Sequence, residues 1–152
     1  MRALPERQSV SGDETFMRAA LEQALIAESA GEVPIGAIVV VGGEIVGHGY
    51  NRSIADHDPS GHAEVVALRA AGIRLGNHRI VGGILYVTVE PCPMCTGAIV
   101  QARIARVVFG CTDPKAGAPN HRAEMVGGVM AEECAATLRD FFQLRRGGKT
   151  TE

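Results

Sequence analysis

The spacing of apolar residues changes along the chain, and each spacing predicts a different kind of element. Residues 14–30 carry an apolar stripe with helical spacing, which predicts an amphipathic helix. Ser11 to Glu14 has the form of a capping box that would start this helix, and Gly31 can end it. Residues 1–12 are therefore expected to form an N-terminal tail. The stripe consists of Phe16, Ala20, Ala24 and Ala27.

Strand-like runs follow this helix. Residues 35–41 are almost continuously apolar, as expected for a strand that is covered on both faces. Gly42 and Gly43 are typical of a two-residue hairpin turn, so residues 44–50 would return as a second strand. Residues 51–61 are polar and contain turn-forming residues, which predicts a loop.

The rest of the chain alternates between helical and strand-like segments. We expect helices over residues 61–71, 91–102 and 132–146, strands over 84–89 and 106–110, and a short last strand within 123–129. Residues 147–152 would form a C-terminal tail. This alternation predicts one α/β domain over residues 1–152, folded as a three-layer α/β/α sandwich with helices on both faces of a central sheet.

The composition supports a single compact domain. The chain has 152 residues, and 46% of them are hydrophobic, which is enough for a substantial core. No apolar run is long enough to span a bilayer, and the N-terminus has no hydrophobic stretch of signal-peptide type. We therefore expect a cytoplasmic protein whose four cysteines stay reduced. Cys111 and Cys134 lie in predicted apolar elements and would be packed thiols.

The net charge limits the kind of nucleic-acid contact that the chain can make. A formal net charge of −2 and a pI of about 6.2 argue against a sequence-blind nucleic-acid binder, because such proteins are normally basic. These values are still compatible with a local basic patch that binds nucleic acid. They are equally compatible with basic residues that only face solvent. The basic residues gather in two places, Arg103 with Arg106 and a C-terminal group of Arg139, Arg145, Arg146 and Lys149.

Two short motifs carry the candidate chemistry. Residues 62–64 read His-Ala-Glu, and residues 91–95 read Pro-Cys-Pro-Met-Cys. Taken alone, the first is a common tripeptide, and the second also fits a redox dithiol, half of a structural zinc site or two buried thiols. Together they supply one imidazole and two thiolates, which suit a tetrahedral zinc with one open position. The chain has no second Cys-x-x-Cys to close the site, so a catalytic zinc is favoured.

The predicted Zn²⁺ ligands are His62, Cys92 and Cys95, which all lie near the N-termini of predicted helices. The positive end of a helix dipole favours thiolate over thiol, and Pro91 suits the start of its helix. Zinc would lower the pKa of bound water from roughly 15.7 to near 7. Glu64 is not a ligand in this scheme; we expect it to be the catalytic group that carries the proton of that water to the substrate.

The residues around these motifs resemble one branch of the cytidine deaminase-like superfamily. The zinc motif itself is common to zinc-dependent nucleobase deaminases. The flanking blocks resemble the bacterial tRNA-specific adenosine deaminases, which convert the wobble adenosine of tRNA to inosine. The resemblance extends from about residue 13 to residue 147. It is carried by residues 33–37, 51–52, 58–64, 85–95, 107–115, 132–136 and 140–142.

The resemblance implies a five-stranded mixed sheet, a tRNA anticodon loop as substrate, and a homodimer whose partner subunit helps to complete the RNA site. It also implies substrate contacts. Asn51 would hydrogen-bond the flipped base, and Ala63 would offer its backbone N–H. Val33 and Pro34 would wall the pocket, and Asp113 would lie beside the target ribose. By residue type alone, Asn51 and Asp113 would be turn residues.

The chain departs from the resembled family at one place. After Gly117 and Ala118 the family usually has a longer segment with some helical character, whereas here only Pro119 precedes residues 120–122. The shortened loop after Ala118 leaves the zinc motif intact, but we expect it to affect RNA grip, dimer contact and selectivity. His121 loses its usual surroundings and is given no role.

These observations leave several functions to compare. The leading hypothesis is a zinc-dependent hydrolase that deaminates the wobble adenosine of a tRNA. A deaminase of a free base or nucleoside, of guanine or cytosine type, is the main alternative; the acidic pI and the shortened loop favour it, and the flanking blocks oppose it. A non-catalytic zinc or interaction protein is opposed by Glu64 and the open ligand position. A thiol-redox protein is opposed by the His-Ala-Glu motif.

Overall fold

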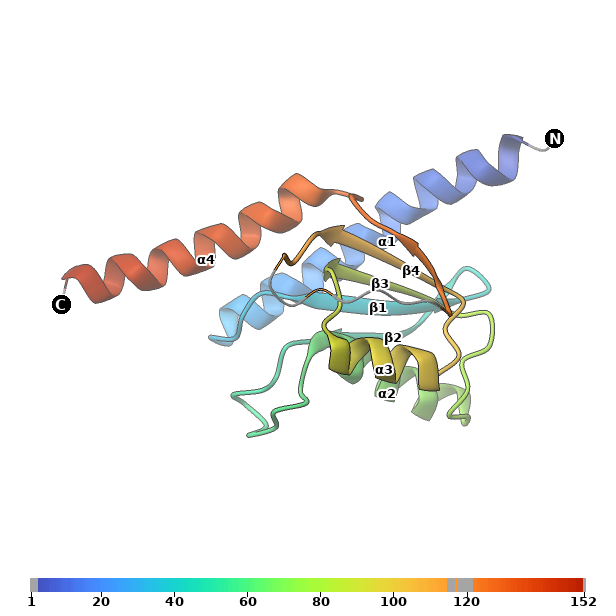
Figure 1. Cartoon of the computed structure of the whole chain (residues 1–152), viewed down its shortest axis with the longest axis horizontal. Coiled ribbons are helices and arrows are strands. Elements are labelled where there is room, and N and C mark those ends of the chain that lie inside the picture. Colours follow the sequence, from blue (N-terminus) through green and yellow to red (C-terminus); the bar gives the residue numbers. More distant parts are fainter. Residues whose placement is uncertain (1–2, 115–116, 118–121, 152) are drawn as a thin grey trace.

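The structure is a computed structural model that describes residues 3–114, 117 and 122–151. The shortened loop after Ala118 and His121 lie outside the described residues. The described elements follow one another along the chain as shown in Figure 1. They are α1 (Ala3–Ser29), β1 (Gly36–Val41), β2 (Glu44–Tyr50), α2 (Ala63–Leu75), β3 (Ile84–Val89), α3 (Pro93–Gln101), β4 (Arg106–Cys111), β5 (Glu124–Val126) and α4 (Ala131–Thr151).

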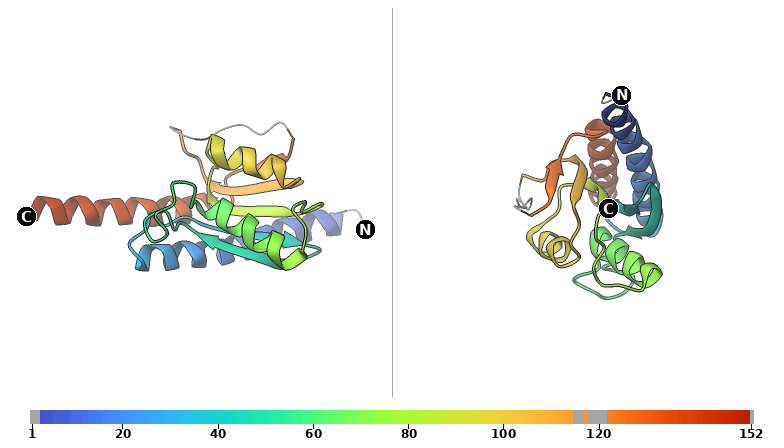
Figure 2. Two further views of the ribbon diagram at one scale, coloured as in Figure 1. Left: turned by 90° about the horizontal axis from the view of Figure 1, so that it is seen from below. Right: turned by 90° about the vertical axis from the view of Figure 1, so that its right-hand side faces the viewer.

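The strands form one mixed sheet in the order β2-β1-β3-β4-β5. β1 is antiparallel to both β2 and β3, whereas β3 and β4, and β4 and β5, are parallel. Helices α1 and α4 lie on one face of the sheet, and α2 and α3 lie on the other (Figures 1 and 2). The predicted three-layer sandwich with a five-stranded mixed sheet is therefore confirmed.

The hydrophobic core has two halves, one on each side of the sheet. In β1, Ala37 and Val39 pack with residues of α2 and α3, whereas Ile38 and Val40 pack with residues of α1. Successive side chains of a strand point to opposite faces, so a strand buried on both faces needs apolar residues at every position. This explains the continuous apolar run in the sequence.

Gly49 brings α2 into close contact with β2. A Cβ atom at this position would overlap the carbonyl oxygen of Ala63 and the backbone nitrogen of Ala67. Because glycine has no Cβ, the first turn of α2 can lie directly against the strand. This contact fixes the height of the helix N-terminus above the sheet, and therefore the position of the His-Ala-Glu motif.

Several predicted helix boundaries are wrong. α1 begins at Ala3 and contains the supposed capping box, so the residues predicted as an N-terminal tail are helical from Ala3 onward. Pro5 does not prevent this, because proline is tolerated in the first turn of a helix. At the other end, α4 continues to Thr151, through most of the predicted C-terminal tail. α2 begins at Ala63 and α3 at Pro93, each two residues later than predicted.

Asp13, which lies within the predicted capping box, has partners outside its own helix. Its side chain is buried and accepts hydrogen bonds from the Tyr86 hydroxyl at 2.7 Å and from the Arg106 guanidinium at 2.9 and 2.8 Å. Arg106 also contacts Glu124 at 3.2 Å. These contacts join the middle of α1 to β3 and β4.

Replacing Asp13 with alanine is expected to lower the free energy of unfolding by about 2–4 kcal/mol, because the buried Tyr86 hydroxyl would lose its partner and Arg106 would keep only the exposed Glu124. Urea unfolding measures the change. Glu14→Ala is the matched control, since Glu14 is exposed on the same helix and its loss should change stability by about 0.5 kcal/mol or less. Equal effects of the two substitutions would contradict a structural role for Asp13.

Candidate metal centre and active site

The two motifs meet where the N-termini of α2 and α3 lie above the sheet. His62 is the N-cap residue of α2, and Cys92 is the N-cap residue of α3. Cys95 lies in the first turn of α3 and is fully buried. Pro93, rather than Pro91 as predicted, is the first residue of α3, where its missing N–H costs no helical hydrogen bond.

The three predicted ligand side chains face one another. Nδ1 of His62 lies 3.6 Å from Sγ of Cys92 and 3.4 Å from Sγ of Cys95. In a tetrahedral zinc site, with Zn–N of about 2.05 Å and Zn–S of about 2.3 Å, nitrogen and sulfur are about 3.6 Å apart. All three ligand atoms lie within 4.8 Å of one another. The spacing and the donor set therefore both fit a zinc ion.

The protonation state of the Cys95 sulfur depends on whether a positive charge lies nearby. Burial, together with the neighbouring Glu64 and Cys92, raises the pKa of the Cys95 thiol far above its ordinary value. The N-terminus of α3 favours the thiolate, but burial outweighs that effect. A divalent cation between the sulfurs would reverse the balance, because a coordinated thiol is deprotonated. This arrangement of donors is therefore consistent with a metal centre.

Glu64 lies beside the same sulfur. It occupies the first turn of α2, its side chain is buried, and its carboxyl group hydrogen-bonds the Cys95 thiol. Burial raises the pKa of Glu64 to about 7. A carboxyl group that can gain and lose a proton near neutral pH therefore lies next to the predicted ligands, which is the requirement for general acid–base chemistry.

Asn51 and Ala63 are joined to each other. The backbone N–H of Ala63 donates to Oδ1 of Asn51 at 2.9 Å. A substrate base could accept a hydrogen bond from the Ala63 N–H only if the Asn51 amide moved. The Nδ2 donor of Asn51 makes none of the described contacts and is available to a substrate base. The orientation of the amide is thus set by the start of α2.

The other predicted substrate residues lie at the same end of the sheet. Val33 and Pro34 directly precede β1, and the Asn51 N–H donates to the carbonyl oxygen of Ile35 at 3.2 Å. Asp113 follows β4, and its backbone N–H donates to Oε1 of Glu90 at 3.0 Å. Glu90 lies only two residues before Cys92. The structure therefore brings the predicted base-contacting and ribose-contacting residues to the end of the sheet where the cysteines lie.

Comparisons with known proteins agree with this geometry. Residues 10–111 match the family described as the cytidine and deoxycytidylate deaminase zinc-binding region. The tRNA-specific adenosine deaminase of Haemophilus influenzae is 46% identical over 153 residues, which cover 92% of this chain and 88% of that protein. The chain belongs to the tRNA-specific adenosine deaminase family.

Solved structures extend the comparison to the fold of this family. A chain from a study of A-to-I editing by tRNA:A34 deaminases at the wobble position of tRNA is 38% identical, with a TM-score of 0.78, and the match covers 82% of this chain and 99% of that chain. The guanine deaminase of Bacillus subtilis is 40% identical with a TM-score of 0.62, over 65% of this chain and 64% of that chain. The match to the tRNA deaminase is the more complete of the two.

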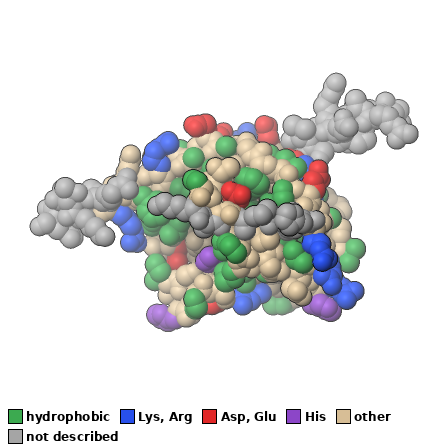
Figure 3. Space-filling model, in the orientation of Figure 1, with side chains coloured by type: hydrophobic (Ala, Val, Ile, Leu, Met, Phe, Trp, Pro, Cys, Tyr) green, Lys and Arg blue, Asp and Glu red, His purple; other side chains and the backbone are tan. Residues whose placement is uncertain are grey.

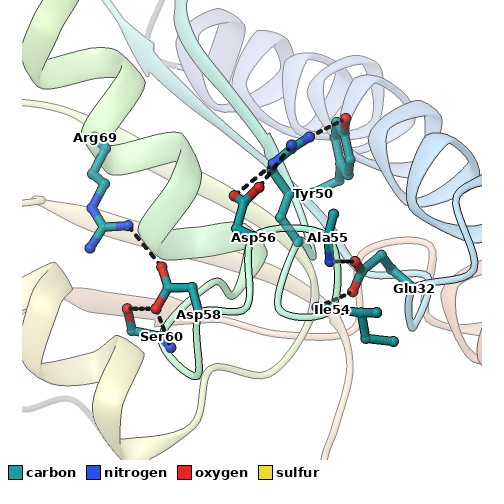
Figure 4. Close-up of polar contacts among 9 residues, drawn as sticks. Glu32, Tyr50, Ile54, Ala55, Asp56, Asp58, Ser60 and Arg69 are labelled. Carbon is teal, nitrogen blue, oxygen red and sulfur yellow. Dashed lines mark hydrogen bonds and ion pairs between the residues drawn. The ribbon is translucent and has the colours of Figure 1, made fainter.

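Glu32 is a buried carboxylate that sequence reasoning missed. It accepts hydrogen bonds from the backbone N–H groups of Ile54 and Ala55, in the loop formed by residues 51–62, hereafter the polar loop (Figure 4). In the sequence, Glu32 directly follows the glycine that ends α1, where an acidic residue is normally exposed. The only local feature that sets Glu32 apart is the apolar segment after it. The pattern of apolar and polar residues therefore does not predict that its carboxylate is buried.

Among the side chains that the structure describes, two of the basic candidates are already paired with neighbours. Arg106 is engaged by Asp13 and Glu124, and Arg145 donates to the Gly31 carbonyl oxygen at 3.1 Å. On the face shown in Figure 3, the basic side chains lie in separate places, with one group at the lower right. Arg139 is exposed, and the side chains of Arg146 and Lys149 are outside the described part. Among the described residues, no helix combines the length and hydrophobicity that a membrane span requires.

Proposed function

We propose that this chain is a zinc-dependent deaminase that converts the wobble adenosine of a tRNA to inosine in the cytoplasm. The observation that carries the proposal is the convergence of His62, Cys92 and Cys95, with the Glu64 carboxyl group beside them. Membership of the tRNA-specific adenosine deaminase family supports the choice of base and of RNA. Zinc is the metal that best suits one imidazole and two thiolates with an open fourth position.

The mechanism assigns a separate task to each residue. When bound, zinc supplies hydroxide from water near neutral pH. Glu64 would take a proton from the attacking water and pass it to a ring nitrogen of the adenine as the C–O bond forms. It would then move the proton of the new hydroxyl group to the amine as the C–N bond breaks. Asn51 orients the base through its amide, and Val33 and Pro34 limit the space around it. The products are inosine and ammonia.

A base in an anticodon loop is a suitable substrate for such a site. Bases in single-stranded loops can be turned out of the stack at little cost and inserted into a pocket, where Watson–Crick edge contacts identify them. Asp113 would then lie beside the ribose of the flipped nucleotide. Because the chain is slightly acidic overall, phosphate contacts would have to come from local residues, and exposed Arg139 is one candidate.

The homodimer expected from the resemblance also belongs to the proposal. A groove of about 780 Å³ runs between α2 and α3, and apolar side chains such as Leu68, Ile73 and Ile80 line it. Ile73 is 83% exposed. Exposed apolar residues of this kind often mark protein–protein contacts, which supports a second copy as the occupant. Light scattering should give twice the 16.0 kDa of one chain, and a single-chain mass would exclude the dimer.

The alternative substrate is a free base, and the similarity to a guanine deaminase favours keeping it. Purified protein would be incubated separately with a tRNA pool, free adenosine and guanine. The proposal predicts a mass gain of about one dalton at the wobble nucleoside of tRNA and little conversion of the free compounds. Conversion of guanine without any change in tRNA would overturn the RNA substrate but leave the zinc chemistry in place.

A further inference from the structure

Hydrogen bonds within the polar loop hold its parts together. The Arg52 N–H donates to the Gly61 carbonyl oxygen at 2.8 Å, which joins the two ends of the loop. Within it, the Asp58 N–H donates to the Ser53 carbonyl oxygen at 3.0 Å. The Arg52 guanidinium also pairs with Asp56 at 2.9 and 3.0 Å (Figure 4). The position of this loop relative to the site therefore depends on its contacts with the rest of the protein.

The residue on which the loop docks is itself held firmly. Gly31 has a φ of +81°, a left-handed conformation that ends α1 and that glycine adopts without strain. The backbone N–H of Glu32 then donates back to the Ala27 carbonyl oxygen at 2.9 Å. Arg145 of α4 donates to the Gly31 carbonyl oxygen. The backbone of Glu32 is thus fixed by α1 and α4 together.

The Glu32 carboxylate connects the end of α1 to the polar loop. Its side chain projects into the loop, with Oε1 at 3.2 Å from the Ile54 nitrogen and Oε2 at 2.7 Å from the Ala55 nitrogen (Figure 4). Glu32 is only 2% exposed, so water cannot easily replace either bond. Both oxygens are used, which fixes the distance and the angle of the loop.

We propose that Glu32 is a positioning residue that sets the width of the substrate pocket. Val33 and Pro34, directly after Glu32, form one wall, and Asn51, at the start of the polar loop, forms the other. The inference rests on the proposed function, because it assumes that Val33, Pro34 and Asn51 surround the substrate base. Glu32 does not touch the base in this scheme. The Asn51 N–H donates to the Ile35 carbonyl oxygen, which holds the Asn51 backbone near β1, and Glu32 acts beside this bond by fixing the part of the loop that follows Asn51.

The test compares Glu32→Ala with Glu32→Gln. Alanine removes both acceptors, whereas glutamine keeps the side-chain volume and one acceptor. We expect kcat/KM for an anticodon stem-loop to fall by about 10- to 100-fold in Glu32→Ala, since misplacing a contact residue by about 1 Å has an effect of this size. Glu32→Gln should recover part of the loss. Glu22→Ala, an exposed carboxylate on α1, should match the wild type.

A double variant separates positioning from general stability. If Glu32 acts through Asn51, then Glu32→Ala should cost little more activity in an Asn51→Ala background, so the two losses will not multiply. All variants would be assayed at a temperature where circular dichroism shows that they are folded. Zinc content should stay at that of the wild type, because the metal ligands are held by α2 and α3.

Each outcome decides the question. A wild type that leaves tRNA unchanged refutes the proposed substrate, and the same comparison would then be made on the base that the wild type does deaminate. Wild-type kinetics in Glu32→Ala, fully multiplicative losses in the double variant, or loss of zinc from Glu32→Ala would each overturn the positioning role. The expected pattern is reduced kcat/KM, partial recovery by glutamine and non-multiplicative coupling to Asn51.

Discussion

Glu64→Ala is expected to keep its zinc and its fold while losing turnover by about 10²- to 10⁴-fold or more. The carboxyl group is the only described acid in contact with the sulfur of Cys95, so no neighbour can take over its proton transfers. It is not one of the three predicted ligands, which is why the metal should remain. Single-turnover assays on an anticodon stem-loop would separate the chemical step from RNA binding.

The isosteric variant Glu64→Gln makes this test sharper. Glutamine fills the same buried space and cannot accept the proton, so it should lose as much turnover as alanine does while RNA affinity stays unchanged. Glu44→Gln is a matched control, since Glu44 is exposed at the far end of the β1–β2 hairpin. Near-normal turnover in either Glu64 variant would show that another group carries the proton.

Cys95→Ser is expected to lose bound zinc and, with it, almost all activity. A serine hydroxyl does not ionise near neutral pH, so only one imidazole and one thiolate would remain. The folded protein should also become less stable, because a ligand that binds only the folded state stabilises it in proportion to its occupancy. The loss would be about 3–4 kcal/mol if free zinc normally exceeds the dissociation constant by 100- to 1,000-fold.

Cys134→Ala provides the comparison for Cys95→Ser. Cys134 is also a buried thiol, and it packs on the opposite side of the sheet, among residues of α1 and α4. Its replacement should lower stability by about 1–2 kcal/mol through lost packing but leave one zinc per chain. Metal analysis and thermal unfolding measure both effects. Retention of zinc in Cys95→Ser, or its loss in Cys134→Ala, would contradict the ligand assignment.

The sequence predicts the sheet well because the strands are buried on both faces. The run at residues 35–41 has no helical spacing, and a glycine pair follows it, so a strand and a hairpin were the simplest interpretation. Val41 and Glu44 do pair across Gly42 and Gly43. The order of the strands is different in kind, because pairing between β1 and β3 joins segments that no local pattern relates. The resemblance implied a five-stranded mixed sheet but gave no strand order.

Contacts between distant residues explain most of what the sequence did not predict. Residues 11–14 fit a capping box by local pattern, but Asp13, which lies within it, contacts Tyr86 and Arg106, which are 73 and 93 residues away. Glu32 binds backbone N–H groups, which any residue could supply, so its partners leave no trace in the sequence. The roles of Glu32 and Asp13 become visible only when their surroundings are known.

The metal-binding motifs were more predictable, because their chemistry depends on residue type. An imidazole and two thiols at that spacing have few common uses, and their meeting requires only that two helices start at the same edge of the sheet. The exact helix starts were predicted two residues too early. Pro91 and Pro93 are both plausible first residues, and the structure selects Pro93.

X-ray absorption at the zinc edge of the purified protein tests the central claim most directly. The account predicts one zinc per chain with two sulfur neighbours at about 2.3 Å and two nitrogen or oxygen neighbours at about 2.0–2.2 Å, one from His62 and one from solvent. Four sulfur neighbours, a shell of oxygen alone, or the absence of tightly bound zinc would contradict it.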